Sequence, residues 1–251
     1  MKKFIAYFDY LGFKDFIENN DTEFQHQIMN NNFRDIEMAL ADGKTKPASR
    51  GVISDIDQSQ INCMNFSDTV VFWTNDDSDE ALAEILKVAF RFNWQCNEFT
   101  FPVKGAVVHG DIFHADFRQK NQGGGIYNIN SLYGRGLVEA YLIAENQHWA
   151  GTVIDETVIS VIRDRGQDPL TTLEPFAKKY MVPYKKPKEN PEEEFTLRLV
   201  KGDLPEEAFK NVSENIRRNF GEYNKRTDHP GVQQKLENTI TYLKSFMVNN
   251  S

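Results

Sequence analysis

The strongest constraint on the fold is a run of apolar and aromatic residues near the start of the chain, from Phe4 to Leu11, which ends at Gly12. A run of this length bounded by a glycine is typical of a buried strand, and Asp9 lies inside it. A carboxylate in such a strand loses its hydration, so its burial costs free energy unless a cation or hydrogen-bond donors compensate the charge. The first strand is therefore predicted to be buried and to carry an acid that needs a partner.

The rest of the pattern alternates strands and helices, and the strongest helical stripe of apolar residues lies within 81–96. Helices are predicted over 14–41 (one long or two short), 81–96, 134–145 and 156–162. Strands are predicted over 51–55, 61–74, 101–108 and 151–154, with hairpin turns at 66–68 and 110–113 and with loops over 43–50 and 117–130, the latter a flexible one. The order strand, helix, strand, strand, helix, strand predicts an α+β fold with a ferredoxin-like core, in which helices flank a largely antiparallel sheet.

The composition changes after about residue 165, where lysines, glutamates and three prolines crowd into 178–194. A strand over 195–200 and two helices within 204–247 are predicted to follow. We expect residues 1–165 to form the core and residues 166–251 to be a strand-helix extension packed on it, not an independent domain. The basic run 185–188 and the acidic run 192–194 are expected to form a solvated, self-neutralising loop.

Charge and cysteine content exclude some classes of protein. The 251-residue chain has 29 basic and 37 acidic residues, a net charge of -8, which argues against a protein that wraps nucleic acid through phosphate contacts. Two cysteines cannot form a disulfide framework, so a reducing cytosol is the simplest location. The N-terminal run does not have the pattern of a signal peptide, and no stretch is apolar enough to span a membrane. We expect a cytoplasmic protein with no nucleic-acid or membrane partner.

A second acid, Asp68, lies in the motif NFSDTVVF, at the expected tip of a hairpin. If the first strand lies beside this hairpin, Asp9 and Asp68 can share magnesium or manganese ions, which prefer oxygen ligands, with the backbone carbonyl of Tyr10 as a further ligand. Two such cations would clamp a triphosphate and lower the pKa of an attacking hydroxyl. The alternative is structural: Asp9 bonds to backbone amides at a strand end, and Asp68 is a turn residue.

Four motifs together resemble a known family. In chain order they are FDYLGFKDFI, FSDTVVF, KGAVVHGDI and YGRGLVEAYLIAE. Their order and spacing resemble the class III nucleotide cyclases, and most closely the bacterial pyrimidine cyclases of the Pycsar antiphage defence system, over about residues 3–160. The resemblance implies that residues 1–165 are a cyclase catalytic core and that the protein is a head-to-tail homodimer with active sites at the interface.

The resemblance also implies the chemistry. Asp9 and Asp68 would hold two divalent cations, Mn²⁺ or Mg²⁺, and the ribose 3′-hydroxyl of a nucleoside triphosphate would attack the α-phosphate with loss of pyrophosphate. The cyclic nucleotide would then activate a separate effector that senses it during phage infection.

Departures from the wider class III pattern bear on the substrate. Met64 stands where purine cyclases carry a lysine, and Ser131 where an adenine-selecting acid would be. Val138 and Leu142 stand where those cyclases carry the asparagine that orients the ribose and the arginine that stabilises the phosphate. These differences agree with a pyrimidine substrate, UTP or CTP, with UTP favoured, and they make Met64 a candidate nucleotide-binding residue.

The cation that stabilises the transition state must then come from elsewhere, because transfer at the α-phosphate needs positive charge on the non-bridging oxygens. The candidates are Arg50, Arg91, Lys104 and Arg135. Arg135 is assigned the catalytic role and Arg50 and Lys104 nucleotide binding, against the alternative that each is a solvated surface charge.

Gly12 and Phe13 lie where the first strand enters its helix, next to Asp9. The first amides of that helix could cradle phosphate oxygens, which makes both residues candidates for nucleotide binding. The alternative is that Gly12 is a turn residue and Phe13 belongs to the core.

Two other functions stay open. One is a non-enzymatic module that uses a degenerate cyclase fold to bind nucleotides or to dimerise, and the absence of the asparagine and the arginine at Val138 and Leu142 favours it. Retention of both Asp9 and Asp68 argues against it, because a pure binder does not need a two-metal acid pair. The other is a different two-metal phosphotransferase on a ferredoxin-like sheet.

Overall fold

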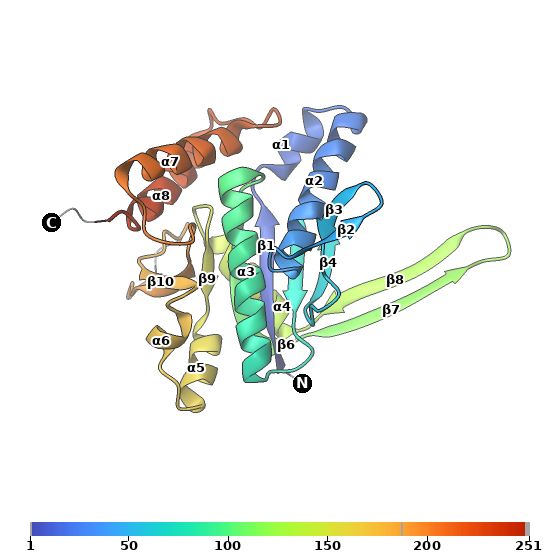
Figure 1. Cartoon of the computed structure of the whole chain (residues 1–251), viewed down its shortest axis with the longest axis horizontal. Coiled ribbons are helices and arrows are strands. Elements are labelled where there is room, and N and C mark those ends of the chain that lie inside the picture. The colour runs from blue at the N-terminus through green and yellow to red at the C-terminus, as the bar shows by residue number, and fades with distance from the viewer. Residues whose placement is uncertain (1, 187, 249–251) are drawn as a thin grey trace.

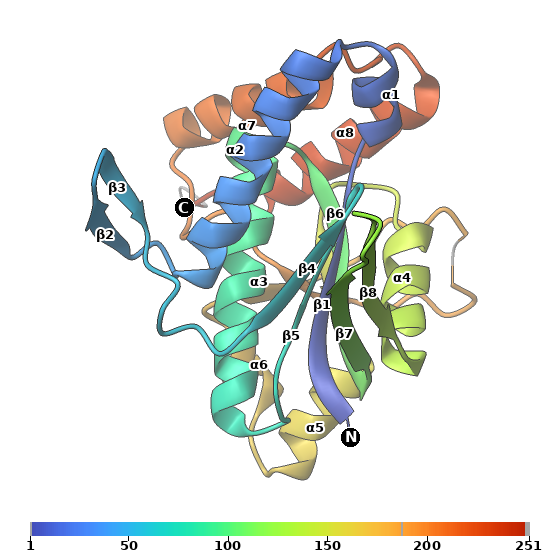
Figure 2. The ribbon, with the colours of Figure 1, turned by 90° about the vertical axis from the view of Figure 1, so that its right-hand side faces the viewer.

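The structure is a computed structural model that describes residues 2–186 and 188–248. Its main strands are β1 (Lys2–Tyr10), β4 (Asn62–Phe66), β5 (Thr69–Trp73), β6 (Val103–Asp111), β9 (Thr152–Ile154), β10 (Ala177–Tyr180) and β11 (Glu194–Leu197). They form one seven-stranded sheet in the order β10-β11-β9-β6-β1-β5-β4, with β1 near its middle (Figures 1 and 2). Neighbouring strands are antiparallel except for the parallel pair β6 and β9. The predicted α+β fold with a largely antiparallel sheet is confirmed.

Helices cover both faces of this sheet. They are α1 (Phe13–Glu18), α2 (Thr22–Leu40), α3 (Asp79–Phe99), α4 (Arg135–Asn146), α5 (Glu156–Asp164), α6 (Pro169–Leu173), α7 (Glu206–Gly221) and α8 (Pro230–Lys244). The predicted helices over 81–96, 134–145 and 156–162 are confirmed, and 14–41 forms two helices. Within the described residues, the structure contains no helix that is both long and apolar enough for a membrane span.

Successive side chains of β1 point to opposite faces of the sheet. Phe4, Phe8 and Tyr10 pack against α3 in a cluster of buried aromatic and aliphatic side chains, which we call the closed face. Tyr7 and Asp9 point to the other side, which we call the open face, where Tyr7 packs with α4. The strand β1, which was predicted from sequence, thus contributes side chains to the core on one face and to the candidate site on the other.

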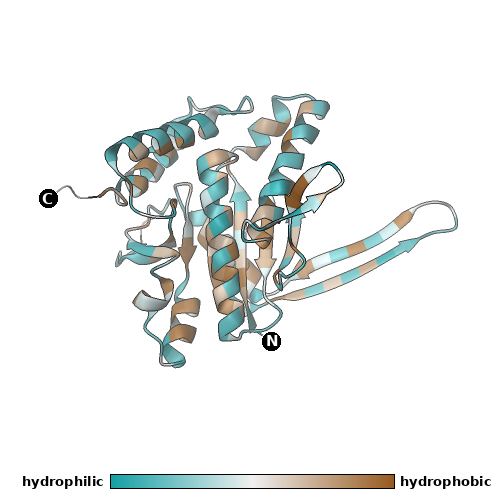
Figure 3. Cartoon of the chain, in the orientation of Figure 1, coloured by the Kyte–Doolittle hydropathy of each residue, from teal (hydrophilic) through white to brown (hydrophobic). Residues whose placement is uncertain are grey.

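Two segments that were predicted as loops are strands. The segment 117–130 lies within an antiparallel ribbon formed by β7 (Phe113–Lys120) and β8 (Ile126–Tyr133), which projects far from the sheet (Figure 1). Polar and apolar residues alternate along the ribbon (Figure 3), and aromatic pairs stack across its strands. The chain leaves the sheet after β6, and β7 pairs with β8, so the predicted hairpin at 110–113 is wrong. Within 43–50, the strand β2 (Thr45–Ala48) pairs with β3 (Gly51–Ser54).

The region after residue 165 is built into the sheet. β10 and β11 continue it beside β9, and α7 and α8 cover the end of the sheet where β1 finishes (Figure 1). Trp149 stacks on Tyr180 with ring centroids 5.5 Å apart and packs against Tyr242 at 4.7 Å. Residues on both sides of position 165 therefore share one sheet and one hydrophobic cluster. The strand β10 and the short helix α6 were not predicted, although the strand over 195–200 and the two terminal helices were.

Candidate active site

The two acids singled out in the sequence lie side by side. β1 pairs with β5 so that Asp9 is opposite Thr69, the residue that follows Asp68. The amide of Tyr10 donates a hydrogen bond to the carbonyl oxygen of Asp68 at 2.9 Å, and Ser67 takes the left-handed conformation (φ 54°) that the tight turn requires. The end of the first strand and the tip of the β4–β5 hairpin thus bring the carboxylates of Asp9 and Asp68, the acid pair, to one edge of the open face.

The environment of Asp9 disfavours its charge. Burial raises its pKa from 3.8 to about 6; Lys104 opposes this shift, and the negative charge of Asp68 adds to it. The side chain is 22% exposed. A nearby cation would lower the pKa of Asp9 again and so favour its charged form, because an opposite charge stabilises a carboxylate.

Lys104 provides one such cation within the chain. It lies opposite Asp9 on β6, its side chain is only 5% exposed, and its Nζ is 3.4 Å from Asp9 Oδ2. Its Nζ also donates to Glu145 Oε2 at 2.6 Å. Glu145 comes from the last turn of α4 and pairs with Lys185 as well. Burial raises the pKa of Glu145, but Lys104 and Lys185 outweigh this and lower it to about 2.

The acid pair fits a cation that takes only part of its ligands from protein. Of the residues that the structure describes, no group of three or more His, Cys, Asp and Glu is close enough to cage a metal. Magnesium in nucleotide sites is held by one or two carboxylates, with water and substrate phosphates as the other ligands. The side chain of Tyr10 is buried toward the closed face, so only its backbone carbonyl can join Asp9 and Asp68.

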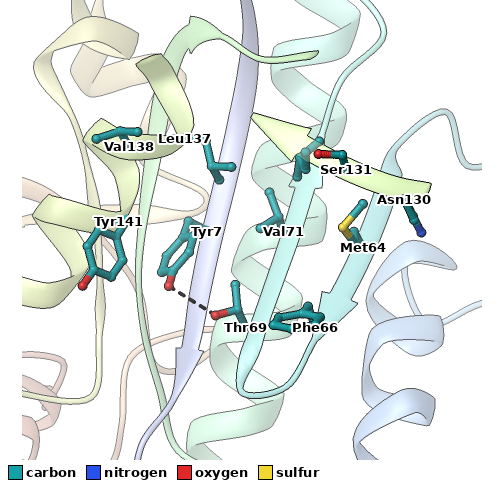
Figure 4. Close-up of a pocket in the computed structure, with 11 residues that line it drawn as sticks. Tyr7, Met64, Phe66, Thr69, Val71, Asn130, Ser131, Leu137, Val138 and Tyr141 are labelled. Carbon is teal, nitrogen blue, oxygen red and sulfur yellow. Dashed lines mark hydrogen bonds between the residues drawn. The ribbon is translucent and has the colours of Figure 1, made fainter. Parts of the chain in front are cut away.

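A cavity of about 490 Å³ opens beside the acid pair on the same face (Figure 4). Its size is in the range of small-molecule sites. Tyr7, two residues before Asp9, lines the cavity and its hydroxyl is hydrogen-bonded to Thr69 Oγ1 at 3.3 Å. Burial raises the pKa of Tyr7 to about 12, so its hydroxyl stays protonated at neutral pH. The lining residues are Tyr7, Met64, Phe66, Thr69, Val71, Asn130, Ser131, Leu132, Leu137, Val138 and Tyr141.

Three of the positions that distinguish this chain from purine cyclases meet in this cavity. Met64 comes from β4, Ser131 from β8 and Val138 from α4; Met64 and Ser131 lie on one side of the cavity and Val138 on the other (Figure 4). The lining contains no charged side chain. Leu142, one helical turn beyond Val138, is exposed on the same helix.

The loop after β1 is held in place by the end of the chain. Gly12 has a left-handed backbone (φ 80°), and a Cβ there would lie 2.9 Å from the buried stem of Lys225. Asn20 donates to the carbonyl oxygen of Tyr223 at 2.7 Å, and Arg226 pairs with Asp15 at 2.7 Å. We call these contacts the α7–α8 clamp. They fix the segment in which the predicted phosphate cradle lies.

Phe13 is the first residue of α1, and its ring packs against Phe16 at 5.8 Å and Phe101 at 6.3 Å. Its side chain therefore belongs to the core, as the alternative interpretation held. Any contact of Phe13 with phosphate must come from its amide.

The predicted arginines are not brought to the acid pair of the same chain. Arg50 is exposed in the turn between β2 and β3, and Arg91 lies on α3 and bonds to Asp42 at 3.1 Å. Arg135 is the exposed first residue of α4, about 15 Å along the helix from Glu145. Among the predicted cations, only Lys104 lies beside the acid pair.

Sequence reasoning missed two members of this region, Glu145 and Lys185. Glu145 lies three residues after Leu142, which itself lies four residues after Val138, so all three share one face of the helix. This spacing could have identified Glu145 from the sequence. Lys185 was assigned to a solvated, self-neutralising loop, which is wrong, since it pairs with Glu145. That assignment is right for Lys188, which pairs with Glu194 at 2.8 Å.

No protein-family model and no curated protein matches this chain. Several solved structures do. The guanylate cyclase domain of RhGC from Catenaria anguillulae, in complex with GTP, is similar with a TM-score of 0.52 and 9% identity over 78% of this chain and 96% of that one. The catalytic core of a rhodopsin-guanylyl cyclase with converted specificity, in complex with ATPαS, gives 0.51 and 8% over 78% and 94%.

A dimeric guanylyl cyclase domain of the RhoGC fusion protein from the aquatic fungus Blastocladiella emersonii is similar with a TM-score of 0.50 and 9% identity, over 78% of this chain and 93% of that one. At such identities the likeness concerns the fold alone. The chain therefore has the fold of the class III nucleotide cyclase domains.

Proposed function

We propose that the protein is a pyrimidine nucleotide cyclase that converts UTP, or CTP, to the 3′,5′-cyclic monophosphate and pyrophosphate. The observation that carries this proposal is the acid pair, Asp9 and Asp68, beside an uncharged cavity large enough for a nucleoside. The cyclase fold agrees with it.

In the proposed reaction the 3′-oxygen of the ribose bonds to the α-phosphorus while the bond from that phosphorus to the bridging oxygen breaks. The hydroxyl proton leaves to solvent, and the electron pair of the broken bond departs with pyrophosphate. Two divalent cations, Mg²⁺ or Mn²⁺, held by Asp9, Asp68 and the Tyr10 carbonyl, would neutralise the phosphates and lower the pKa of the hydroxyl. The amides of Gly12 and Phe13 are proposed to bind phosphate oxygens.

Lys104 is the proposed cation nearest the reacting phosphate, because it already contacts Asp9. Arg50 and Arg135 lie away from the acid pair of their own chain, so their proposed roles require the site of a partner subunit.

The pyrimidine assignment is supported by the cavity wall. Met64, Ser131 and Val138 replace the lysine, the acid and the asparagine with which purine cyclases are expected to hold base and ribose. A neutral wall with the hydroxyls of Tyr7 and Ser131 suits a small uncharged base that hydrogen-bonds through its carbonyl oxygen. UTP is the favoured substrate, with CTP as the alternative.

A homodimer is supported by apolar surface on the open face. Phe66, Val138 and Leu142 are 78%, 56% and 58% exposed around the cavity. The ribbon of β7 and β8 is exposed along nearly its whole length, and an isolated two-stranded hairpin is only marginally stable in water. Exposed apolar surface of this kind typically marks an interface. A second copy of the chain is the proposed occupant.

The non-enzymatic binding module keeps one observation in its favour. Lys104 neutralises Asp9 without a metal ion, as a salt bridge with a purely structural role would. The antiphage role, the separate effector and the cytoplasmic location stay predictions that rest on the sequence resemblance.

The test is to incubate the purified protein with each of the four NTPs and Mn²⁺ or Mg²⁺ and to separate the products. We expect cyclic UMP, or cyclic CMP, and pyrophosphate in equal amounts. Asp68→Asn should abolish turnover, whereas Asp164→Asn, which changes an exposed acid at the end of α5, should not. If no NTP is cyclised, or if Asp68→Asn is as active as the wild type, the proposed function is wrong.

A further inference from the structure

Among the residues that the structure describes, the lining of the open-face cavity contains one carboxamide, the side chain of Asn130. The other polar side chains of the lining carry hydroxyl groups, which donate or accept a hydrogen bond as a ligand requires. A carboxamide has an oxygen that only accepts and a nitrogen that only donates, so it offers a fixed polarity once its direction is fixed. Asn130 is therefore the lining side chain best suited to distinguish a donor from an acceptor on a ligand.

Asn130 lies near the base of the ribbon, on the side that faces the sheet. Side chains alternate along β8, so Asn130 and Leu132 point to the same face of the ribbon, and Leu132 packs against the buried cluster of the open face. Leu132 is paired with His114 of β7, whose ring lies 5.3 Å from that of the buried Trp73. Asn130 lies on the same side of the cavity as Met64 (Figure 4).

A hydrogen bond to His114 fixes the direction of this carboxamide. Nε2 of His114 lies 2.8 Å from Oδ1 of Asn130. Because the carboxamide oxygen can only accept, Nε2 carries the hydrogen and donates it. The nitrogen of Asn130 forms no hydrogen bond with any residue of 2–186 and 188–248. The cavity is thus offered the N–H groups of Asn130, whereas the oxygen is already engaged.

The two pyrimidine bases differ at the position where such a polarity can be read. Uracil has a carbonyl oxygen at C4, which accepts a hydrogen bond, and cytosine has an amine there, which donates. An N–H group that faces C4 bonds to uracil, but it opposes a second donor when the base is cytosine. A site with a fixed hydrogen-bonding group rejects a base that cannot match it, because a desolvated polar group then stays unpaired.

We propose that Asn130 selects uracil over cytosine by donating to the C4 oxygen, and that His114 is the positioning residue that keeps the amide turned toward the base. The inference rests on the proposed function, because it takes the cavity to hold the base of a nucleoside triphosphate. It assigns a residue to the choice between UTP and CTP, which the acid pair and the uncharged lining leave open.

A cross-strand contact that only stabilises the ribbon is the competing explanation. Such a contact would be served by either direction of the carboxamide, and it would not affect the order in which two bases bind. The location of the pair favours the selective role. Asn128, the next residue outward on the same face of β8, is not part of the cavity lining, and its side chain has no hydrogen-bond partner within the part of the chain that the structure describes.

The experiment measures, by calorimetry with Mg²⁺, the binding of UTP and CTP analogues in which a methylene replaces the oxygen between the α- and β-phosphates. Wild type should bind the UTP analogue about tenfold more tightly, the effect of one hydrogen bond that the other base cannot make. Asn130→Asp keeps one oxygen for His114 and places a second where the amide nitrogen was. This variant should invert the preference and favour the CTP analogue about tenfold.

The ratio of the two affinities is insensitive to partial misfolding and to the added charge, because both analogues carry the same phosphates. Asn128→Asp is the matched control, since it adds the same charge on the same face of the exposed ribbon, and it should keep the wild-type ratio.

The role of His114 is tested separately. His114→Phe keeps a ring against Trp73 but removes the donor, so the amide of Asn130 can turn over and the ratio should fall to about one. Long-range ¹H–¹⁵N NMR of the wild type should find the hydrogen of the neutral imidazole on Nε2. A hydrogen on Nδ1 would mean that the oxygen of Asn130 faces the cavity, and it would overturn the inference.

The outcomes separate this inference from the proposed function. An unchanged ratio in Asn130→Asp would overturn the inference even in an active cyclase. The expected inversion in a protein that cyclises no NTP would refute the proposed function and leave Asn130 as the residue that selects the base. Failure of wild type to bind either analogue would overturn both.

Discussion

The two faces of the central sheet use the same strand in opposite ways. On the closed face, an aromatic core under α3 buries Phe4, Phe8 and Tyr10 of β1. On the open face, Tyr7 and Asp9 border a cavity, and apolar side chains of α4 stay exposed. The chain itself buries the apolar side chains of the closed face, whereas several apolar side chains of the open face stay exposed to solvent. The larger aromatic core therefore lies on one side of β1, and the proposed chemistry lies on the other.

The largest expected effect is a difference in the free energy of unfolding between variants of the two faces. Phe8→Ala leaves a void among Phe72 and Phe92 and should lower the free energy of unfolding by about 3–5 kcal/mol. Tyr7→Phe on the open face removes only the bond to Thr69 and should cost about 1 kcal/mol or less. Urea denaturation measures both, and equal losses would contradict the division.

A second comparison sets Asp9 against Asp35, an acid under the closed face. Burial raises the pKa of each from 3.8 to about 6, and Asp35 accepts a hydrogen bond from Thr100 at 2.7 Å. Because the folded protein binds these protons more tightly, the wild type should lose stability as the pH rises from about 4 to about 6. Asp9→Asn and Asp35→Asn should each recover up to about 3 kcal/mol at pH 7.

The two variants should differ in function. Asp9→Asn should abolish cyclase turnover, and Asp35→Asn should keep it. Thermal melts across pH 4–8 together with product assays measure both properties. A loss of turnover in Asp35→Asn would show that the closed face contributes to the chemistry after all.

The same acids can be followed by carboxyl NMR titration. Addition of Mg²⁺ with a non-hydrolysable UTP analogue should lower the pKa of Asp9 from about 6 toward its ordinary value, because an opposite charge favours the carboxylate. The pKa of Asp35 should stay near 6, since no ligand reaches it. Parallel shifts of both acids would indicate a general change of the fold instead of a metal at the acid pair.

The smallest effect concerns the exposed apolar surface. Leu142 on the open face and Leu170 on α6 are each 58% exposed, so they form a matched pair. Leu142→Ser should raise the dissociation constant of the homodimer about tenfold, because it removes apolar area from the proposed interface. Leu170→Ser should leave it unchanged. Sedimentation velocity over a range of protein concentration distinguishes the two, and an equal response would place the interface elsewhere.

Local signals account for what the sequence predicted correctly. The helix over 81–96 has an unbroken apolar stripe, and Ser78 caps it by accepting from the amide of Ala81 at 3.2 Å. Asp9 is an acid in an apolar strand and Asp68 is an acid at a hairpin tip, so each could be recognised locally. Their proximity could then be predicted from a single strand pairing, that of β1 with β5.

The failures have a common physical cause, since they depend on contacts between distant segments. The ribbon over 113–133 was missed because its strands bury little and its glycines resemble a loop. Glu145 and Lys185 lie near Lys104 only because α4 and the segment before β11 return to β6, which no local pattern reveals. Arg50 and Arg135 were chosen by residue type, and their positions depend on the fold. Met64 and Lys104 lie on strands that were predicted from sequence, over 61–74 and 101–108.

The α7–α8 clamp has a consequence for biosynthesis. Tyr223, Lys225 and Arg226, which hold the loop after β1, leave the ribosome some two hundred residues after that loop does. A nascent chain can therefore form the strand that carries Asp9 long before the loop that follows this strand is fixed. A translation product that stops before Tyr223 would therefore carry the acid pair without the contacts that hold the loop beside it.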